Sequence, residues 1–328
     1  MNLEDKKSKV GDTISSKGLG PRSFEEYVGQ EKLKAKLNIA IEAASARGEA
    51  LDHLLLYGPP GLGKTTISKL IAKKLNVSIR VTSGPVLDKV GDIASILMSL
   101  SANDILFIDE IHRMNKSVEE ALYPAMEEGK MDLIIGKGPT AKSVRFNLKK
   151  FTIIGATTKA SLLSSPLRDR FGLVHRIEPY PIDDLTKIVL KAAALLSLDL
   201  NETAAEEIAV RSRATPRISY RLLRRVRDYA QVKGLKEVDL SSAERALDML
   251  DVDSYGLDEL DRAIISAIIA KFKGGPVGIE ALSIAVGEDK RTIEDVHEPY
   301  LLRMGFISRT SRGRVATKLA YEHMEVKQ

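Results

Sequence analysis

The spacing of hydrophobic positions changes partway along this chain. Up to about residue 180, short apolar runs at 54–57, 77–82, 104–108 and 151–156 alternate with segments of helical spacing, of which 31–47 is the clearest. Further helices are expected at 66–75, 92–100 and 118–128. Strands that alternate with helices predict an α/β domain, with a parallel sheet sandwiched between helices.

Beyond this region the pattern is helical. Four helices are predicted at 183–196, 203–212, 218–232 and 241–250. After a short linker, three more at 258–272, 279–286 and 289–303 precede a two-strand ribbon, 307–310 and 314–316. Three helices and a ribbon are the plan of a winged helix, a relative of the helix-turn-helix.

These shifts predict three domains. Residues 1–180 form the large α/β domain, with a polar N-terminal segment to about residue 18. Residues 181–253 form a small all-helical lid domain, and residues 254–328 form the winged-helix domain. A chain of 328 residues is long enough for two or three cores.

Composition narrows the function classes. The chain has 44% hydrophobic and 29% charged residues, as soluble globular proteins do. It has 0 cysteines, which excludes disulfides, zinc–thiolate sites and cysteine nucleophiles. Its net charge of +5 favours an anionic partner. Because we find no secretory signal and no apolar run long enough to span a membrane, we expect a cytoplasmic protein without a membrane partner.

The strongest motif is a glycine loop at 58–65 that fits the pattern G-x-x-x-x-G-K-[ST]. An apolar strand precedes it and a helix follows, which is the context this motif requires. Glycines such as Gly61 and Gly63 let backbone N–H groups turn inward around an anion, at a helix N-terminus. Lys64 would reach the β- and γ-phosphates, and the Thr65 hydroxyl would bind Mg²⁺. A chance glycine turn is the alternative, and both flanks argue against it.

A second motif is the pair of carboxylates that ends the strand at 104–108. Asp109 would hold Mg²⁺ through water, and Glu110 would activate the attacking water. Catalytic groups belong at the carboxyl ends of strands in an open α/β sheet. A solvated acidic loop is the alternative, but it is a weak one so soon after a phosphate loop.

Several segments allow two interpretations from their residues alone. The segment 19–30 is either a lid on the core or an apolar wall for a nucleotide base. The predicted hairpin at 131–146 is either a surface excursion or a docking surface for a protein. Thr157 or Thr158, at a strand end, could sense the γ-phosphate. Arginines at 168 and 170 are either solvated, which their sequence alone favours, or one supplies positive charge to a neighbouring subunit.

Basic residues mark the rest of the chain. Arg217 begins a strongly basic helix, which is either a solvated face or a route back to the γ-phosphate. Between Pro299 and Tyr321 there are five basic residues and no acidic one: Arg303, Arg309, Arg312, Arg314 and Lys318. A basic ribbon suits contact with a phosphate backbone, and a winged helix used for protein contact is the alternative.

The motifs taken together resemble a known family. The segments 58–65, 109–112, 155–158, 165–172 and 215–217 occur in the order of an AAA+ ATPase. Five further passages resemble the RuvB family, whose members are the motors of Holliday-junction branch migration. They are 27–30, 82–85, 221–230, 271–278 and 292–301. The resemblance runs from about residue 19 to residue 321.

This resemblance implies roles for individual residues. ATP or ADP and Mg²⁺ are the implied cofactors, with Thr65 and Asp109 as metal ligands. The implied catalytic residues are Lys64, Asp109, Glu110, Thr158, Arg170 and Arg217, with Arg170 as an arginine finger for the next subunit. The implied nucleotide-binding residues are Leu19, Tyr27, Val28, Gly61, Gly63, Lys64, Thr65, Thr66, Glu127, Glu128, Gly129, Tyr180 and Arg217. The implied DNA contacts are Arg309, Arg312 and Arg314.

The resemblance also implies an activity and partners. We expect a homohexameric ring on duplex DNA that uses ATP to pull the arms of a four-way junction, in recombination and repair. The hairpin at 131–146 matches the segment that docks on the junction-binding protein RuvA, and RuvC is a candidate third partner. One departure is Gly20-Pro21, where the family usually has Arg-Pro. Gly20 has no side chain to meet the nucleotide, and Arg22 is a substitute only at a different spacing.

Two other functions compete with this one. A clamp-loader or origin-binding AAA+ ATPase would use ATP as an assembly switch, although a clamp loader usually carries a helical collar rather than a winged helix. A non-catalytic DNA-binding protein would keep these motifs as relics. Intact Lys64, Asp109, Glu110 and Arg170 argue against the relic.

Overall fold

The computed structural model describes residues 18–135 and 142–326. These residues form two compact units. The first unit runs to Ile188 and includes Thr215–Tyr220. The second comprises Val189–Ala214 and the chain from Arg221 onward. Each unit is described by itself below.

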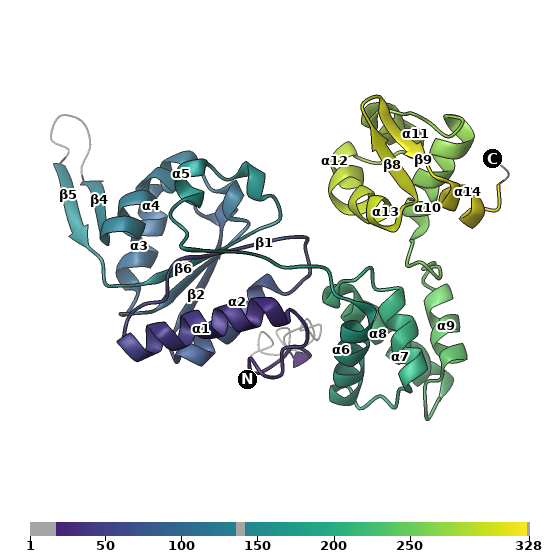
Figure 1. Cartoon of the computed structure of the whole chain (residues 1–328), viewed down its shortest axis with the longest axis horizontal. Helices are drawn as coiled ribbons and strands as arrows, with labels where there is room; N and C mark the ends of the chain where they lie inside the picture. The colour runs from purple at the N-terminus through teal and green to yellow at the C-terminus, as the bar shows by residue number, and fades with distance from the viewer. Residues whose placement is uncertain (1–17, 136–141, 327–328) are drawn as a thin grey trace, which may run out of the picture. The chain divides into compact units, whose positions relative to one another are not determined.

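A five-stranded parallel sheet organises the first unit (Figure 1). Its strand order is β2-β3-β6-β1-β7. The strands are β1 (Leu54–Tyr57), β2 (Ile79–Ser83), β3 (Ile105–Asp109), β6 (Thr152–Thr157) and β7 (Leu173–Arg176). The three central strands β1, β3 and β6 are buried along almost all of their length, as continuous apolar runs require.

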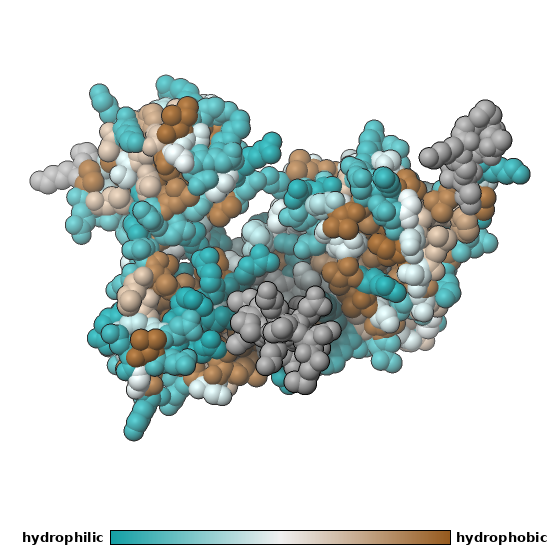
Figure 2. Space-filling model, turned by 180° about the vertical axis from the view of Figure 1, so that it is seen from behind, coloured by the Kyte–Doolittle hydropathy of each residue, from teal (hydrophilic) through white to brown (hydrophobic). Residues whose placement is uncertain are grey.

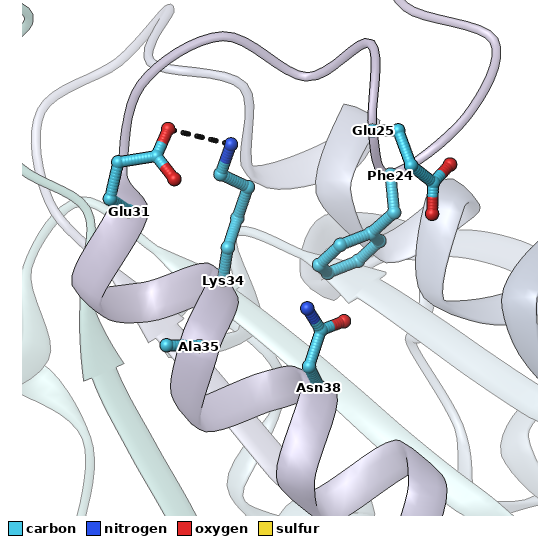
Figure 3. Close-up of a pocket in the computed structure, with 6 residues that line it drawn as sticks. All are labelled: Phe24, Glu25, Glu31, Lys34, Ala35 and Asn38. Carbon is cyan, nitrogen blue, oxygen red and sulfur yellow. Dashed lines mark ion pairs between the residues drawn. The ribbon is translucent and has the colours of Figure 1, made fainter.

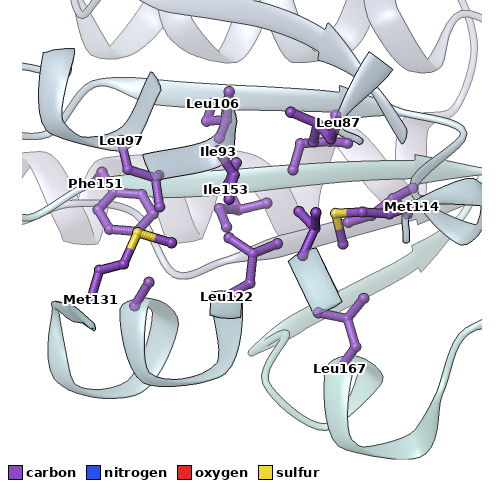
Figure 4. Close-up of a cluster of buried hydrophobic side chains, with 14 of the residues drawn as sticks. Leu87, Ile93, Leu97, Leu106, Met114, Leu122, Met131, Phe151, Ile153 and Leu167 are labelled. Carbon is purple, nitrogen blue, oxygen red and sulfur yellow. The ribbon is translucent and has the colours of Figure 1, made fainter. Parts of the chain in front are cut away.

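Helices cover both faces of the sheet (Figure 1). They are α1 (Glu31–Arg47), α2 (Lys64–Leu75), α3 (Val90–Ser99), α4 (Lys116–Glu128) and the short α5 (Ser165–Arg168), with 3₁₀ turns η2 (Gly84–Val86), η3 (Ile111–Arg113) and η5 (Ala160–Leu162). On the face of α3 and α4, side chains such as Ile93, Leu122, Leu106 and Ile153 form one fully buried cluster (Figure 4). This core holds the strand ends of the sheet in fixed positions.

The α/β prediction is confirmed for this unit. The run at 54–57 and the segment 31–47 have the predicted bounds, as β1 and α1. The strand β7 was missed. Only Leu173 and Val174 in it are apolar, and β7 is a partly exposed edge strand, so its hydrophobic pattern is too short to identify.

The predicted hairpin is also present. Strands β4 (Lys130–Ile135) and β5 (Lys142–Asn147) pair antiparallel, and the hairpin extends from the end of α4 (Figure 1). The part of the prediction at 136–141 lies outside the described residues. Arg145 and Asp132 stand opposite each other in the pairing and form a salt bridge of 2.7 Å.

After β7, the chain forms only helices up to Asp248. They are α6 (Ile182–Leu195), α7 (Glu202–Val210), α8 (Pro216–Lys233) and α9 (Leu240–Asp248). Asn201 and Asp239 cap α7 and α9, because each side chain accepts a hydrogen bond from a backbone N–H of the first turn. The four helices predicted from the sequence are therefore confirmed.

The last part of the second unit has the winged-helix plan. Its helices are α10 (Glu259–Ser266), the π-helical turn η6 (Ala267–Lys271), α11 (Ile279–Val286), α12 (Lys290–Thr292), the π-helical turn η7 (Ile293–His297) and α13 (Glu298–Met304). Strands β8 (Ile307–Thr310) and β9 (Gly313–Ala316) pair antiparallel as the wing, and α14 (Lys318–His323) follows. A separate core that includes Leu257, Ile264, Leu301 and Phe306 holds these elements together.

Candidate active site and nucleic-acid interface

Three neighbouring strands bring the sequence motifs together at one edge of the sheet. The glycine loop follows β1, Asp109 ends β3, and Thr157 ends β6, which lies between those two strands. All three strands are parallel, so their carboxyl ends share an edge. The N–H of Gly58 donates a 3.2 Å hydrogen bond to the carbonyl of Thr157, which joins the loop to β6.

The loop can only be built from glycine at its turning points. Gly58, Gly61 and Gly63 have φ angles of 139°, 80° and 96°. A Cβ at Gly58 would lie 2.5 Å from the carbonyl oxygen of Ile177, and one at Gly61 would lie 2.6 Å from Cγ2 of Thr215. Backbone amides can therefore line the anion site at distances that a side chain would prevent.

Lys64 begins α2 and lies against the loop. Its ammonium donates to the carbonyls of Gly58 and Pro59 at 2.7 and 2.8 Å. Burial lowers the pKa of Lys64 to about 8, the nearby Asp109 carboxylate opposes that shift, and the charge of Arg217 adds to it. The site therefore concentrates positive charge that an anion would stabilise.

The two carboxylates after β3 are arranged differently. Asp109 is partly buried, and one of its oxygens accepts the N–H of Glu110 at 3.0 Å. Glu110 has a positive φ of 46°, and its carboxylate pairs with Arg113 at 2.8 Å. Both side chains of that ion pair are about half exposed, so the pair is weak and Glu110 can leave it.

The two threonines at the end of β6 differ in burial. Thr157 is 1% exposed; its hydroxyl contacts Nδ1 of His112 at 2.9 Å and accepts the N–H of Lys159. Burial lowers the pKa of His112. Thr158 is exposed. Of the two hydroxyls, that of Thr158 is therefore the one open to a ligand.

Side chains from the N-terminal segment brace the glycine loop. Leu19, Tyr27 and Tyr180 are buried and Val28 is partly buried. The Tyr180 hydroxyl donates to that of Tyr27 at 2.8 Å, and burial raises the pKa of Tyr27 to about 12. The Tyr27 hydroxyl is 3.0 Å from where a Cβ of Gly63 would lie. The segment therefore packs on the core, directly beside the loop, as one of its two interpretations predicts; the wall for a nucleotide base stays a prediction.

A shallow pocket lies next to this brace, at the start of α1 (Figure 3). It is lined by Phe24, Glu25, Glu31, Lys34, Ala35 and Asn38. Lys34 pairs with Glu31 at 2.7 Å and donates to the carbonyl of Tyr27 at 2.8 Å. The pocket was not predicted, and its polar contacts anchor the loop that carries Tyr27.

Arg217 reaches the same edge from a distant part of the sequence. Its N–H donates to the carbonyl of Gly61 at 3.3 Å, and its side chain is exposed. The effect of its charge on the pKa of Lys64 places the two side chains in one electrostatic environment. Arg217 therefore lies beside the glycine loop, and its contact with the phosphate end of a nucleotide stays a prediction.

The predicted nucleotide contacts at 127–129 lie at the end of α4, and the first of them pairs with Arg170. Glu127 pairs with Arg170 at 3.1 Å, and Glu128 pairs with Lys130 at 3.2 Å. Gly129 ends α4 with a φ of 65°. These residues remain predicted nucleotide contacts.

The wing of the second unit presents two of its three predicted arginines to solvent. Arg309 is 60% exposed and Arg312 is also exposed. Arg314 is only 5% exposed, and its guanidinium binds Glu298 at 2.7 Å and Glu294 at 3.0 Å. These ion pairs hold the wing on α13 and η7, and the DNA contact of Arg314 stays a prediction.

A further polar cluster in this unit was not predicted. Asp258, Asp261 and His297 lie close enough to suggest a metal site. Arg213, however, pairs with both aspartates, at 2.8 Å to Asp258. His297 contacts Asp261 at 2.7 Å. The guanidinium already supplies the positive charge, so the cluster is an internal ion network.

Among the residues that the structure describes, no helix has the length and apolarity needed to cross a bilayer.

The site combines a glycine loop with a buried lysine, an acidic pair at the end of β3 and an arginine from the helical segment. Together with the winged helix, these features define a P-loop ATPase of the AAA+ class. Family models agree domain by domain. Residues 19–177 match the P-loop domain of the Holliday junction DNA helicase RuvB, 180–253 match the RuvB AAA lid domain, and 254–325 match the RuvB C-terminal winged-helix domain. The chain belongs to the RuvB family.

Individual relatives support this assignment. The chain is 58% identical over 309 residues to the Holliday junction branch migration complex subunit RuvB of Fusobacterium nucleatum, covering 94% of this chain and 93% of the relative. It superposes on the Thermotoga maritima RuvB Holliday junction branch migration motor with a TM-score of 0.85 at 47% identity, covering 94% of this chain and 99% of the other. A mutant of that protein superposes with a TM-score of 0.87 at the same identity and coverage.

The first prediction concerns Lys64. Nucleotide affinity is expected to fall as the pH rises above about 8, because the uncharged amine must then take up a proton to meet the phosphates. The limiting slope is about a tenfold rise in the Kd of ADP per pH unit. Calorimetry from about pH 7 to pH 9.5 measures it. Lys64→Arg is the matched control, since its guanidinium stays charged. If the Kd of the wild type depends on pH as little as that of this variant, the prediction is wrong.

The second prediction separates two arginines of the wing. Arg314→Ala leaves the Glu298 carboxylate buried without its partner and should destabilise the winged helix by about 3–5 kcal/mol. Hydrogen exchange of the winged-helix amides in the full chain measures this. Arg312→Ala should leave exchange unchanged, weaken DNA binding on every sequence, and reduce the slope of log K against log salt by about 1. If both variants exchange alike, the division of roles is wrong.

Proposed function

We propose that this protein is an ATP-driven motor that moves Holliday junctions. The observation that carries the proposal is the meeting of Lys64, the Asp109–Glu110 pair and Arg217 at one sheet edge, in a chain whose three domains all match RuvB models. A phosphate site and a DNA-binding fold on one chain are what a DNA motor needs. The protein acts in the cytoplasm.

The reaction is an in-line attack of water on the γ-phosphate of ATP. Lys64 leaves the loop carbonyls and binds the β- and γ-phosphates. Glu110 orients the water and accepts its proton once it has left Arg113. Thr158 contacts the γ-phosphate or the water, and Arg217 couples the lid to the phosphates.

The residues at the strand edge also suit a magnesium ion. A Thr65 hydroxyl at the start of α2 and an Asp109 carboxylate at the end of β3 are hard oxygen donors of the kind Mg²⁺ prefers. Asp109 is close enough to Lys64 to affect its pKa, so the donors face the phosphate site. A bound Mg²⁺ would neutralise charge on the β- and γ-phosphates.

Arg170 acts on the nucleotide of a neighbouring subunit in a homohexameric ring. In this proposal Glu127, Glu128 and Gly129, near Arg170, face the same neighbouring nucleotide. Arg309 and Arg312 hold the backbone of the duplex, and their exposure supports that role.

The hairpin is the proposed docking surface for RuvA. β5 is exposed along most of its length, and Val144 is 36% exposed. On the face drawn in Figure 2, hydrophobic and hydrophilic residues lie side by side. Mixed apolar and polar surface is typical of protein interfaces. RuvC is a further partner in a complex that resolves the junction.

Branch migration is the direct test. A synthetic four-way junction with ATP and Mg²⁺ should be converted to two duplexes, faster with a cognate RuvA, and Lys64→Ala should be inactive. If ATP is hydrolysed but the junction stays intact even with RuvA, an AAA+ ATPase that uses ATP as an assembly switch is favoured. If ATP turnover does not exceed background, a non-catalytic DNA-binding protein is favoured.

The third prediction concerns Glu110. Glu110→Gln keeps the shape of the side chain but cannot accept a proton, so it should bind ATP while losing at least about 100-fold in turnover. Nucleotide binding and steady-state phosphate release measure the two effects separately. Arg113→Gln is the control, because it frees Glu110 without altering it and should retain turnover. Wild-type turnover by Glu110→Gln would remove this residue from its role.

The fourth prediction concerns Gly20. A Cβ at this position meets no atom within 4 Å, so the backbone leaves room for one. Gly20→Arg should tighten ATP binding by about tenfold, as a charged hydrogen bond to the nucleotide would. Gly20→Ala is the control and should bind like the wild type. Equal affinities for all three proteins would show that this chain does not use the position.

A further inference from the structure

The guanidinium of Arg170 is held on three sides by its own chain. Its Cζ atom lies 4.3 Å from the centre of the Tyr123 ring. One terminal nitrogen donates to the carbonyl of Pro166 at 2.6 Å, and the other pairs with Glu127 at 3.1 Å. A guanidinium stacked on an aromatic face and fixed at its nitrogens points in one direction.

Tyr123 also holds the segment that carries Arg170. Its hydroxyl donates to Glu119 at 2.7 Å and contacts the hydroxyl of Ser164 at 3.2 Å. Ser164 donates to Glu119 as well, and it caps α5 by accepting the N–H of Leu167. Helix α4 therefore fixes both the beginning of this segment, through Ser164, and its end, through Arg170.

A neighbouring arginine shows that this arrangement is specific. Arg168 lies two positions earlier and is exposed, whereas the side chain of Arg170 is 20% exposed. The Nε atom of Arg170 is buried and has no hydrogen-bond partner among the described residues. The side chain of Arg170 is therefore packed against the protein, whereas that of Arg168 is exposed.

The contacts of the guanidinium with Glu127 and with Tyr123 differ in whether a phosphate can replace them. The Glu127 side chain is 56% exposed, so its ion pair is weak and a phosphate can replace it. The Tyr123 ring offers its face from the side of α4 and does not compete with an anion. The ring can therefore stay in contact while the terminal nitrogens change partner.

We propose that Tyr123 is the positioning residue for Arg170, and that Glu127 is a resting partner which the γ-phosphate of the neighbouring subunit displaces. This inference rests on the finger role given to Arg170 above. Tyr123 itself touches no substrate; it acts by keeping the guanidinium at the height and angle that the transition state needs.

Three variants test the proposal in the full chain with DNA and ATP. Tyr123→Leu should lower kcat by about 10–100-fold with little change in KM, because a misplaced group loses transition-state contact. Tyr123→Phe keeps the ring, and its kcat should stay within about threefold of the wild-type value. This variant also shows whether substitution at position 123 prevents folding. Arg168→Ala is the matched control and should be silent. A Tyr123→Leu protein with wild-type kcat, or a Tyr123→Phe protein as impaired as Tyr123→Leu, overturns the role of the ring.

Mixed rings provide a readout that a purely structural role would not move. Subunits of Glu110→Gln bind ATP without turnover and keep an intact Arg170. Tyr123→Leu subunits mixed with an excess of them should recover most of the per-subunit turnover of wild-type subunits mixed in the same way. No recovery would mean that Tyr123 acts within its own subunit, against the proposal.

The role of Glu127 has its own test. Glu127→Gln removes the competing charge and should raise turnover by up to about threefold, since the phosphate then no longer displaces a paired carboxylate. Unchanged or lower turnover overturns the displacement. Arg170→Ala tests the finger role separately from the positioning role of Tyr123. If Arg170→Ala retains full turnover, the finger role is wrong, and the positioning role is wrong with it. If Arg170→Ala is inactive and is rescued by mixing, while Tyr123→Leu has normal turnover, only the positioning role is wrong.

Discussion

The parallel pairing of β1, β6 and β3 is the constraint on which the rest of the site depends. It brings the glycine loop, Thr157 and Asp109 to one edge, although they are separated by about 50–100 residues along the chain. The pairing is stable because the central strands are apolar on both faces and helices cover them. The chemistry at the edge therefore depends on the core beneath it.

Much of this arrangement could be predicted from the sequence, because its signals are local. The glycine loop, the carboxylates after β3 and the helix at 31–47 each follow from neighbouring residues. The buried state of Arg314 could not be predicted, since Arg309 stands directly opposite it in the ribbon and is equally basic. Only the packing of α13 shows which of the two binds Glu298.

Contacts between elements explain the other misses. The stacking of Arg170 on Tyr123 joins α4 to the turn that follows α5, and neither residue belongs to a pattern that predicts the contact. Strand β7 has too few apolar residues to be recognised, yet it closes the sheet beside β1. In both cases tertiary packing, rather than local periodicity, decides the structure.

The hydrogen bonds of Lys64 to Gly58 and Pro59 have a consequence for ligand affinity. They order the loop before a ligand arrives, and the phosphates then replace the two carbonyls as partners of the ammonium. The conformational entropy of forming this nest is lost when the chain folds and is not lost again when a ligand arrives. Substitutions that loosen the brace of Tyr27 and Tyr180 would therefore weaken binding through the loop that these residues support.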